Sequence, residues 1–581
     1  MMTRLVSSFL QPHHSKKVVM LLLLLVVRMM LMIGWCTHHG YIHPDEFFQS
    51  GQELWYGIRL PSWEFQSSHC LRSIVPPTIM TSLPLFVWNQ FSVPPNNIVV
   101  YVLPRIFMGF VSFVLLDLPL WLSHTNSNRN TMMIWSSMWT TWTFFHRPFT
   151  NVMESWYVAI ILHLLLLLLR SSSNHNHHPA QIVLSYIGLG IVASLGINCR
   201  FTFVLFVGPV ILYHFYTLLL HHHHSSSFRS IWKRVMTSMI GFIGTSILWI
   251  SMDTNYYNKK DQIQITPWNA FQYNRQVSNL QHHGIHPHYL HLVVNMPLLY
   301  GPLALYFYYT ELNPFLSVPQ TTTTKTTTKS VNNHNTNNNI SRRVYCRIII
   351  WSGLLGLSIA PHQEPRFLLP LAYPLVQLYS TTTIFQNKLF QSIWWIWTIS
   401  VGCWFSFYHQ SAVIPSLHYL TTLSQQQSSK AIIYYHTYMP PTFMLSNNHN
   451  NNNIKLVMGD IPISSAVCPV SSLQPSSPNS KEEEVVTYFY DLTSNDATLD
   501  TLDHTLHRHL DTDSFVYVVA PKASIPTTTT TTMDKTYEWT PLWSQFQISV
   551  EELPSTPFIH TLLTNPSSFH LVIWKVQTML N

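Results

Sequence analysis

Charged residues are scarce in this chain. Asp, Glu, Lys and Arg make up 9% of its 581 residues, while 47% are hydrophobic. Ordinary soluble domains carry about 25% charged residues. A soluble protein of this length does not need so little charge, whereas a chain that crosses a membrane many times does. The composition therefore argues against a large soluble protein and predicts a polytopic α-helical membrane protein.

Three further absences narrow the function. The net charge of +7 is small for this length, and no basic block is long enough to bind nucleic acid. The six cysteines are scattered without a CxxC pair, which argues against a zinc site or a disulfide scaffold. No HExxH or comparable spacing occurs among the many histidines. We expect neither a metal nor a cofactor.

Long apolar runs fill the first two thirds of the chain. A membrane core about 30 Å thick needs roughly 20 apolar residues as a helix. About eleven spans are predicted, of which the three marked weak are short: 18–36, 98–123, 131–146 (weak), 152–169, 181–198, 201–219, 235–252, 293–310, 347–361 (weak), 366–380 (weak) and 391–408. We expect a terminal segment 1–17, a transmembrane domain 18–408 and a tail 409–581, in which 480–520 has the pattern of a small α/β unit.

Basic residues orient these spans. Counting crossings puts the basic residues named at the end of this paragraph on the side of the N-terminus, which the positive-inside rule makes the cytosol. The loops on the lumenal side, including 37–97, 253–292 and 361–367, then hold the unusual sequence. The orienting residues are Lys16, Lys17, Arg170, Arg229, Lys233, Arg234, Lys325, Lys329, Arg342, Arg343 and Lys388.

The stretch Tyr41–Gln52, YIHPDEFFQSGQ, organises the chain. It follows the first apolar segment and sets Asp45 beside Glu46, after His43. Adjacent acids next to a membrane are costly and indicate a functional site, although acids also favour the first turn of a helix. In an extended loop the two side chains point apart, so we do not expect both to act on one proton.

The other lumenal loops supply a complementary set of groups. Carboxylates and amides suit sugar hydroxyls, aromatic rings suit the apolar face of a sugar, and arginine suits phosphate. In PHQEPRF (361–367), Pro365 disfavours helix at Glu364, so the chain should break there. Besides His43, the candidate binding residues are Arg147, Asn151, Glu154, Arg200, Asp253, Tyr257, His286, His362, Glu364 and Arg366.

Several of these motifs resemble one known family. HPDEFFQS after the first helix, RPFTN with Glu154, and HQEPRF (362–367) are similar to motifs of glycosyltransferase family 22, over residues 37–445. That resemblance implies a GT-C architecture in the endoplasmic reticulum membrane, with lumenal catalytic loops and dolichyl-phosphate mannose as donor. HQEPRF, the pattern from Asn279 to Pro302 and TYMPP (437–441) look most like members that add a fourth, α1,2-linked mannose to a GPI-anchor precursor.

The resemblance also implies a mechanism. The family inverts the anomeric centre in one displacement, which needs a base on the acceptor hydroxyl and positive charge on the leaving phosphate. Asp45 resembles the family's proposed base, with Glu46 orienting it or binding acceptor hydroxyls. Arg366, helped by Arg200 or His362, is the candidate for the lipid phosphate.

Other functions stay open from the sequence alone. A related N-glycan enzyme or the third GPI mannose step would share these motifs, although those members usually have lysine where Gln363 stands. A multispan transporter would place its polar residues inside helices rather than in loops on one face, and would show inverted repeats. A non-catalytic subunit of a glycosylation complex would not need Asp45.

Overall fold

The computed structural model describes residue 30 and residues 34–578, apart from 57–60, 92–94, 123–127, 174–178, 221–225, 258–261, 282–283, 314–331, 380–381, 383, 425–430, 446–453, 459–486, 493–498, 511–513, 526–528, 533–534, 549–560 and 563. Two compact units make up the chain. The first comprises Met1–Thr37, Trp63–Pro84 and Leu103–Gly402, and the second comprises His38–Ser62, Leu85–Val102 and Cys403–Asn581.

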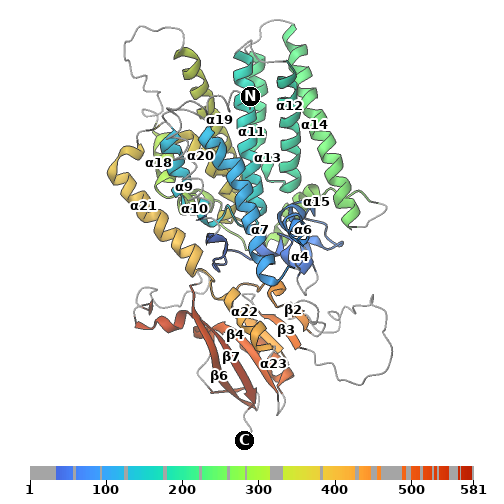
Figure 1. Ribbon diagram of the computed structural model, residues 1–581, viewed down its shortest axis with the longest axis vertical. Coiled ribbons are helices and arrows are strands. Elements are labelled where there is room, and N and C mark those ends of the chain that lie inside the picture. Colours follow the sequence, from blue (N-terminus) through green and yellow to red (C-terminus); the bar gives the residue numbers. More distant parts are fainter. Residues whose placement is uncertain are drawn as a thin grey trace. The chain divides into compact units, whose positions relative to one another are not determined.

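Four long helices lie side by side in the first unit (Figure 1). They are α11 (Thr150–Ser173), α12 (Pro179–Cys199), α13 (Phe203–Leu220) and α14 (Ser226–Tyr257). Their apolar residues run around the whole helix, as expected for helices in lipid. Successive helices are antiparallel, so the start of α11, the turn between α12 and α13, and the end of α14 meet at one end.

Small residues bring α12 and α14 into close contact. A Cβ atom at Gly190 would lie 1.8 Å from the Ser238 carbonyl oxygen, and one at Gly241 would lie 2.3 Å from the Ile187 carbonyl oxygen. The hydroxyls of Ser194 and Ser246 are 2.8 Å apart further along the same contact. Glycine and serine are the residues that allow membrane helices to approach this closely. This packing fixes the end of α14 beside the turn after α12.

Further helical segments, most of them shorter and one of them the 27-residue α19, complete the first unit. Three of them, η2, η3 and η4, have π-helical geometry. The segments are η1 (Trp63–Phe65), α5 (Val75–Pro77), η2 (Thr78–Ser82), η3 (Phe113–Asp117), α8 (Leu118–Leu122), α9 (Asn128–Ser137), α10 (Trp139–Thr143), α15 (Thr266–Asn274), α16 (Val277–Gln281), η4 (His291–Asn295), α17 (Met296–Tyr300), α18 (Pro302–Leu312), α19 (Asn332–Ser358), η5 (Pro365–Leu371), α20 (Ala372–Tyr379), η6 (Ile384–Gln386) and α21 (Lys388–Cys403). Two more, α6 (Leu83–Asn89) and α7 (Asn97–Ser112), contain residues of both units.

Five helices in the described part of the chain are long and apolar enough to cross a membrane. They span Asn97–Leu120, Thr150–Ser171, Pro179–Cys199, Phe203–Leu220 and Phe228–Tyr257. Each coincides with a predicted span, which confirms a polytopic helical membrane protein. The predicted span 131–146 is divided into α9 and α10 by Met138, whose backbone is extended. The predicted span 18–36 lies almost wholly outside the described residues, and the total of eleven stays a prediction.

The second unit contains a seven-stranded mixed sheet in the order β2-β3-β1-β4-β7-β6-β5. Strands β2, β3, β1 and β4 are parallel, and β7, β6 and β5 continue the sheet in antiparallel pairs. The predicted α/β unit at 480–520 is present as β3, α23 and β4, within a larger sheet that the sequence did not reveal. The strands are β1 (Ala431–Tyr435), β2 (Ile454–Met458), β3 (Thr487–Leu492), β4 (Phe515–Pro521), β5 (Thr529–Thr532), β6 (Lys535–Phe546) and β7 (His570–Thr578).

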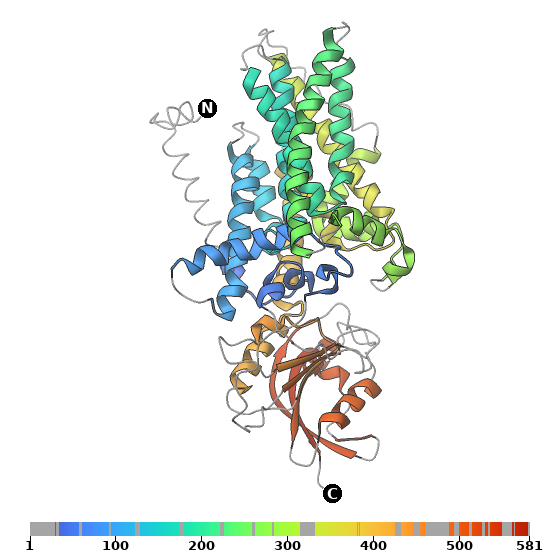
Figure 2. The ribbon, with the colours of Figure 1, turned by 90° about the vertical axis from the view of Figure 1, so that its right-hand side faces the viewer.

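Helices cover both faces of this sheet (Figure 2). On one face, Leu502 and Leu506 of α23 (Leu499–His509) pack against alternate residues of β1, β4, β6 and β7. On the other, Ser416 of α22 (Val413–Ser424) lies 2.8 Å from the Tyr434 hydroxyl. The unit also holds α3 (Asp45–Phe48), α4 (Gln52–Tyr56), η7 (Trp404–Tyr408), η8 (Thr442–Met444), η9 (Lys522–Ser524) and η10 (Pro566–Phe569).

Candidate active site

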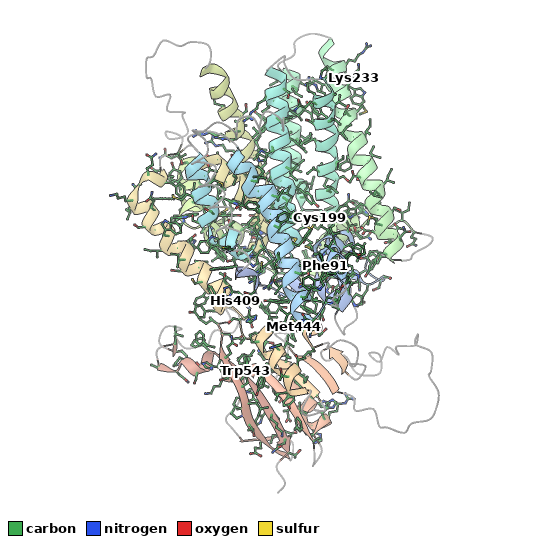
Figure 3. The ribbon with its side chains drawn as sticks, viewed as in Figure 1. Phe91, Cys199, Lys233, His409, Met444 and Trp543 are labelled. Carbon is green, nitrogen blue, oxygen red and sulfur yellow. The ribbon has the colours of Figure 1, made fainter. Side chains whose placement is uncertain are left out.

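A buried carboxylate and a buried arginine meet where α11 begins. Glu154 lies in the second turn of α11, and Arg200 occupies the tight turn between α12 and α13, beside Cys199 (Figure 3). The Arg200 Nε atom is 3.5 Å from Glu154 Oε2, and Arg200 Nη1 donates to the Thr150 hydroxyl at 3.1 Å. The Thr202 hydroxyl donates to the other oxygen of Glu154 at 3.1 Å. The turn thus fixes a cation at this end of the helices.

The loop between α19 and η5 holds a second group of charges. Glu364 has an extended backbone and η5 begins at Pro365, which confirms the predicted break. The two carboxylate oxygens of Glu364 contact different partners: Oε1 is 2.8 Å from His362 Nε2, and Oε2 accepts a hydrogen bond from Arg366 Nε. The Arg366 side chain is buried. Glu364 therefore fixes the positions of both basic side chains.

His362 is held between two acceptors. Its Nδ1 atom is 3.1 Å from the Gly284 carbonyl oxygen, while its Nε2 faces Glu364. Because both neighbours only accept, both ring nitrogens donate when the ring is protonated. Burial lowers the pKa of His362, but the hydrogen bond and the charge of Glu364 outweigh it, so the pKa is raised above its ordinary value. The site therefore favours an imidazolium at this position.

Phe367 joins the two charged groups. Its ring lies under the Arg200 guanidinium at 5.2 Å and beside the Arg366 guanidinium at 5.5 Å. The Arg366 guanidinium also lies 5.7 Å from the Phe149 ring, just before α11. Each guanidinium therefore has an aromatic face in addition to its carboxylate, Glu154 or Glu364. The site thus gathers the basic groups Arg200, Arg366 and His362 around the carboxyl groups of Glu154 and Glu364.

Two more predicted residues lie at the start of α11. Arg147 is fully buried and donates from Nε to the Thr143 carbonyl oxygen at 2.8 Å. Asn151 is also buried, one turn before Glu154. Both lie within two residues of Phe149, around the start of α11. The structure therefore brings Arg147, Asn151 and Glu154 together on one short segment.

His286 belongs to the same cluster through the loop before η4. Its backbone N–H donates to the Pro361 carbonyl oxygen at 2.7 Å, and its Nδ1 accepts from the Gln363 N–H at 3.2 Å. The His286 and His362 rings are 5.6 Å apart. Burial and the neighbouring His362 lower the pKa of His286, so it is the neutral partner of the two.

Gln363 and His291, close to His286, were not among the predicted site residues. The Gln363 side chain, 1% exposed, links the loop before η4 to the turn after α19 through four hydrogen bonds. His291, the first residue of η4, is fully buried, and its Nδ1 lies 3.0 Å from Asn295 Nδ2. With Asn295 donating, the ring proton lies on Nε2, which has no acceptor within the described residues. The dense histidine pattern from Asn279 onward was the available signal for His291.

Asp253, another predicted binding residue, has its hydrogen bonds away from the charged cluster. Its Oδ1 accepts from the Ser73 hydroxyl at 2.8 Å and from the Ile74 N–H at 3.0 Å, and its Oδ2 accepts from the Thr266 hydroxyl at 2.7 Å. All three donors are neutral, and the carboxylate is buried. Asp253 thus joins α14 and α15 to the segment before α5, rather than contacting the charged cluster.

Tyr257 extends this anchor to a further arginine. Its hydroxyl donates to the Arg72 carbonyl oxygen at 2.5 Å. The Arg72 side chain pairs with Glu64 at 2.9 Å and lies close enough to Arg200 for the two charges to interact. Arg72 was missed because its short loop carries no motif. Asp253 and Tyr257 therefore position Arg72 at the edge of the cluster.

His43, Asp45 and Glu46 belong to the second unit. The expectation of an extended loop is wrong here: Asp45 and Glu46 open the helix α3, because Pro44 already has helical geometry. The Asp45 N–H donates to His43 Nδ1 at 3.1 Å, and the Asp45 side chain keeps 21% exposure. Glu46 is fully buried. Of the two acids, Asp45 is the one that remains accessible.

The tail holds this segment in place. Tyr41 donates from its N–H to the His409 carbonyl oxygen at 3.0 Å and from its hydroxyl to the Met439 carbonyl oxygen at 2.7 Å. Glu53, which sequence reasoning missed, is buried and accepts from the N–H groups of Thr442 and Phe443 at 3.1 and 3.2 Å. It thereby caps η8, directly after TYMPP.

No group of three His, Cys, Asp or Glu side chains that could hold a metal ion occurs in the described part of the chain.

Residues 19–446 match the model of the Alg9-like mannosyltransferase family. GPI mannosyltransferase 4 of Aspergillus oryzae is 30% identical over 65% of this chain and 66% of its own length. Human GPI alpha-1,2-mannosyltransferase 4 is 28% identical over 67% of this chain and 69% of its own length. The chain spans about two thirds of these relatives.

A solved structure shares the fold. ArnT from Cupriavidus metallidurans, in a crystal structure bound to undecaprenyl phosphate, superposes with a TM-score of 0.51 at 10% identity. The match covers 86% of this chain and 93% of that one. At this identity the similarity extends to the fold alone, and it agrees with the polytopic helical architecture.

Proposed function

This chain belongs to the Alg9-like mannosyltransferase family, and on that basis we propose that it adds the fourth mannose to a GPI-anchor precursor. The donor is dolichyl-phosphate mannose, the acceptor is the third mannose of the precursor, and the new linkage is α1,2. The relatives from Aspergillus oryzae and human, whose names carry this step, support the assignment.

The observation that carries the proposal is the cluster of Arg200, Arg366 and His362 around Phe367. Its two guanidinium groups and its imidazole suit a phosphate that acquires charge as the glycosidic bond breaks. ArnT binds undecaprenyl phosphate, which, like dolichyl phosphate, carries its phosphate on a long isoprenoid chain. A lipid phosphate at this cluster is the simplest use of these charges in a membrane enzyme.

The reaction needs one displacement and no covalent enzyme intermediate. The acceptor hydroxyl attacks the anomeric carbon, the bond from that carbon to the phosphate oxygen breaks, and the β-linked mannosyl phosphate becomes an α-mannoside. Asp45 takes the proton of the attacking hydroxyl, and Glu46 orients Asp45 or binds acceptor hydroxyls. Because dolichyl phosphate leaves as a stable anion, arginine and imidazolium charges suffice to stabilise it.

The same proposal includes the topology. The chain lies in the endoplasmic reticulum membrane with about eleven crossings, the N-terminus in the cytosol, and the catalytic loops and tail in the lumen. The basic residues between spans support this orientation through the positive-inside rule.

Complementation tests the function directly. The full chain is expressed in cells that lack the fourth-mannose step, and their GPI lipids are analysed for a mannose in α1,2 linkage on the third. We expect the four-mannose precursor to reappear with the parent chain and not with Asp45→Asn at equal protein level. A parent chain that is present in the membrane but leaves the three-mannose precursor unchanged would show that the acceptor is wrong.

A further inference from the structure

The helices of the first unit have a second charged end, remote from the cluster around Phe367. Along α11, Glu154 and Arg170 are 16 residues apart, and along α19 the same spacing separates Arg342 from Ser358, whose carbonyl contacts Gln363. At 1.5 Å per residue, both helices separate the two ends by about 24 Å. Figure 3 likewise shows Lys233 at the opposite end of the helices from Cys199. Anything bound here is distinct from the proposed donor.

Arg342 has unsatisfied donor atoms in the described part of the chain. Its Nε and Nη2 atoms are buried and have no hydrogen-bond partner within the described part of the chain. The residue as a whole is partly exposed. A buried guanidinium donor without an acceptor is costly, and native proteins rarely leave one in that state.

Among the described residues, no carboxylate is one of the groups that act most strongly on Arg342. The groups that act on it electrostatically are the two cations Arg343 and Arg170, with Cys346 and Tyr373. Arg347, on the same helix, forms an ion pair: its Nε atom lies 2.8 Å from Glu311 Oε1. Arg342 is therefore a cation among cations, on a helix where a neighbour has its own carboxylate.

We propose that Arg342, with Arg170 and Arg343, binds a phosphate-bearing anion, supplied by the headgroup of an acidic phospholipid. Arginine is the residue best suited to phosphate, because its planar fork donates two parallel hydrogen bonds. By the positive-inside orientation this end faces the cytosol, where acidic phospholipids concentrate in the membrane surface. The anion supplies acceptors for Arg342 Nε and Nη2 and a negative charge beside the three arginines. The site is independent of the mannosyl transfer.

Lipid titration of the full chain tests the site. The protein is purified in detergent, freed of bound lipid and titrated with phosphatidylinositol or phosphatidylcholine, and the bound lipid is counted by native mass spectrometry. We expect phosphatidylinositol to bind more tightly. Arg342→Gln should weaken it about fivefold, which corresponds to the ~1 kcal/mol that one basic residue contributes to binding acidic lipid. Arg170→Gln, a change at an exposed side chain, should weaken it in the same direction without a risk to folding.

The matched control is Lys233→Gln, which removes one charge at the same end but outside the groups around Arg342. It should leave the affinity for phosphatidylinositol unchanged. Equal binding of the two lipids, or equal losses in Arg342→Gln and Lys233→Gln, would overturn the proposal. If excess inorganic phosphate removes the difference between parent and Arg342→Gln while phosphatidylcholine binds as well as phosphatidylinositol, the anion is free phosphate, and the lipid assignment is wrong.

Discussion

Gln363 is the residue whose replacement should disturb the candidate site most from a position outside it. Its Oε1 accepts from the His291 N–H at 2.8 Å, and its Nε2 donates to the carbonyl oxygens of Ala360, Ser358 and His288 at 3.0, 3.1 and 3.4 Å. Two amide protons are therefore shared among three carbonyl groups. This one side chain holds the loop of His286 against the turn of His362.

Gln363→Glu keeps the acceptor and replaces both donors by an oxygen that faces three carbonyl dipoles. Each lost neutral hydrogen bond costs about 1 kcal/mol, and a buried group without a partner costs about 1–3 kcal/mol. The sum, roughly 3–5 kcal/mol, favours separation of the two loops. A loss of about 3 kcal/mol in the arrangement of the transition state corresponds to a rate about 10²-fold lower.

The assay measures mannose transfer from dolichyl-phosphate mannose to the three-mannose GPI lipids of cells that lack the fourth-mannose step. The melting temperature of the purified chain is measured in parallel. Gln363→Met, which loses the hydrogen bonds without adding charge, should fall between Gln363→Glu and the parent. Gln272→Glu makes the same chemical change on α15 and should behave as the parent. A Gln363→Glu enzyme with more than about a third of the parent rate and an unchanged melting temperature would refute the reasoning. A threefold lower rate corresponds to an activation free energy higher by only ~0.6 kcal/mol.

Four further predictions use the same transfer assay. Asp45→Asn should insert and fold normally but lose about 10²–10⁴ in rate, the range for removing a general base; a helix-capping role predicts almost no change, since Asn also caps well. Arg366→Lys should lose nearly as much as Arg366→Ala, because lysine cannot replace the guanidinium fork; full activity of both variants would exclude the phosphate role. Glu53→Gln should lower the rate by reducing kcat with little change in the donor KM, since Glu53 caps η8 and holds the segment of Asp45; a raised donor KM alone would contradict this. Because the pKa of His362 is raised, its charge is present below that pKa and lost as pH rises through it, so the donor KM should increase toward alkaline pH, and His362→Asn should abolish that dependence.

Much of the site was predictable because its residues follow directly from local sequence. The five described spans could be located by length and apolarity, and the loops between them must return to the same end of the helices. That reasoning brings Glu154 and Arg200 to one end, whereas placing the HQEPRF loop there also uses the spans that stay a prediction. The Pro365 break could also be predicted, because the clash with the preceding residue is purely local.

Contacts over long sequence distances could not be predicted. Glu53 meets Thr442 across 389 positions, and nothing in either segment indicates the other. The sheet of the second unit combines parallel and antiparallel strands whose order depends on tertiary packing rather than on strand propensity. The sequence marked Gln363 only because related motifs usually have lysine there. Its four hydrogen bonds could not be predicted, because some of their partners lie in the loop before η4.

Asp253 and Glu364 show that charge beside a membrane does not by itself tell what a carboxylate contacts. The oxygens of Asp253 accept hydrogen bonds from two hydroxyls and one N–H, all neutral, and these bonds join three chain segments. Glu364 instead contacts His362 and Arg366, and its charge keeps an imidazolium and a guanidinium in place. A carboxylate whose donors are neutral joins chain segments, whereas one whose donors are cations determines the electric field that a phosphate experiences. The chemical identity of the donors, which only the tertiary structure supplies, therefore separates the two roles.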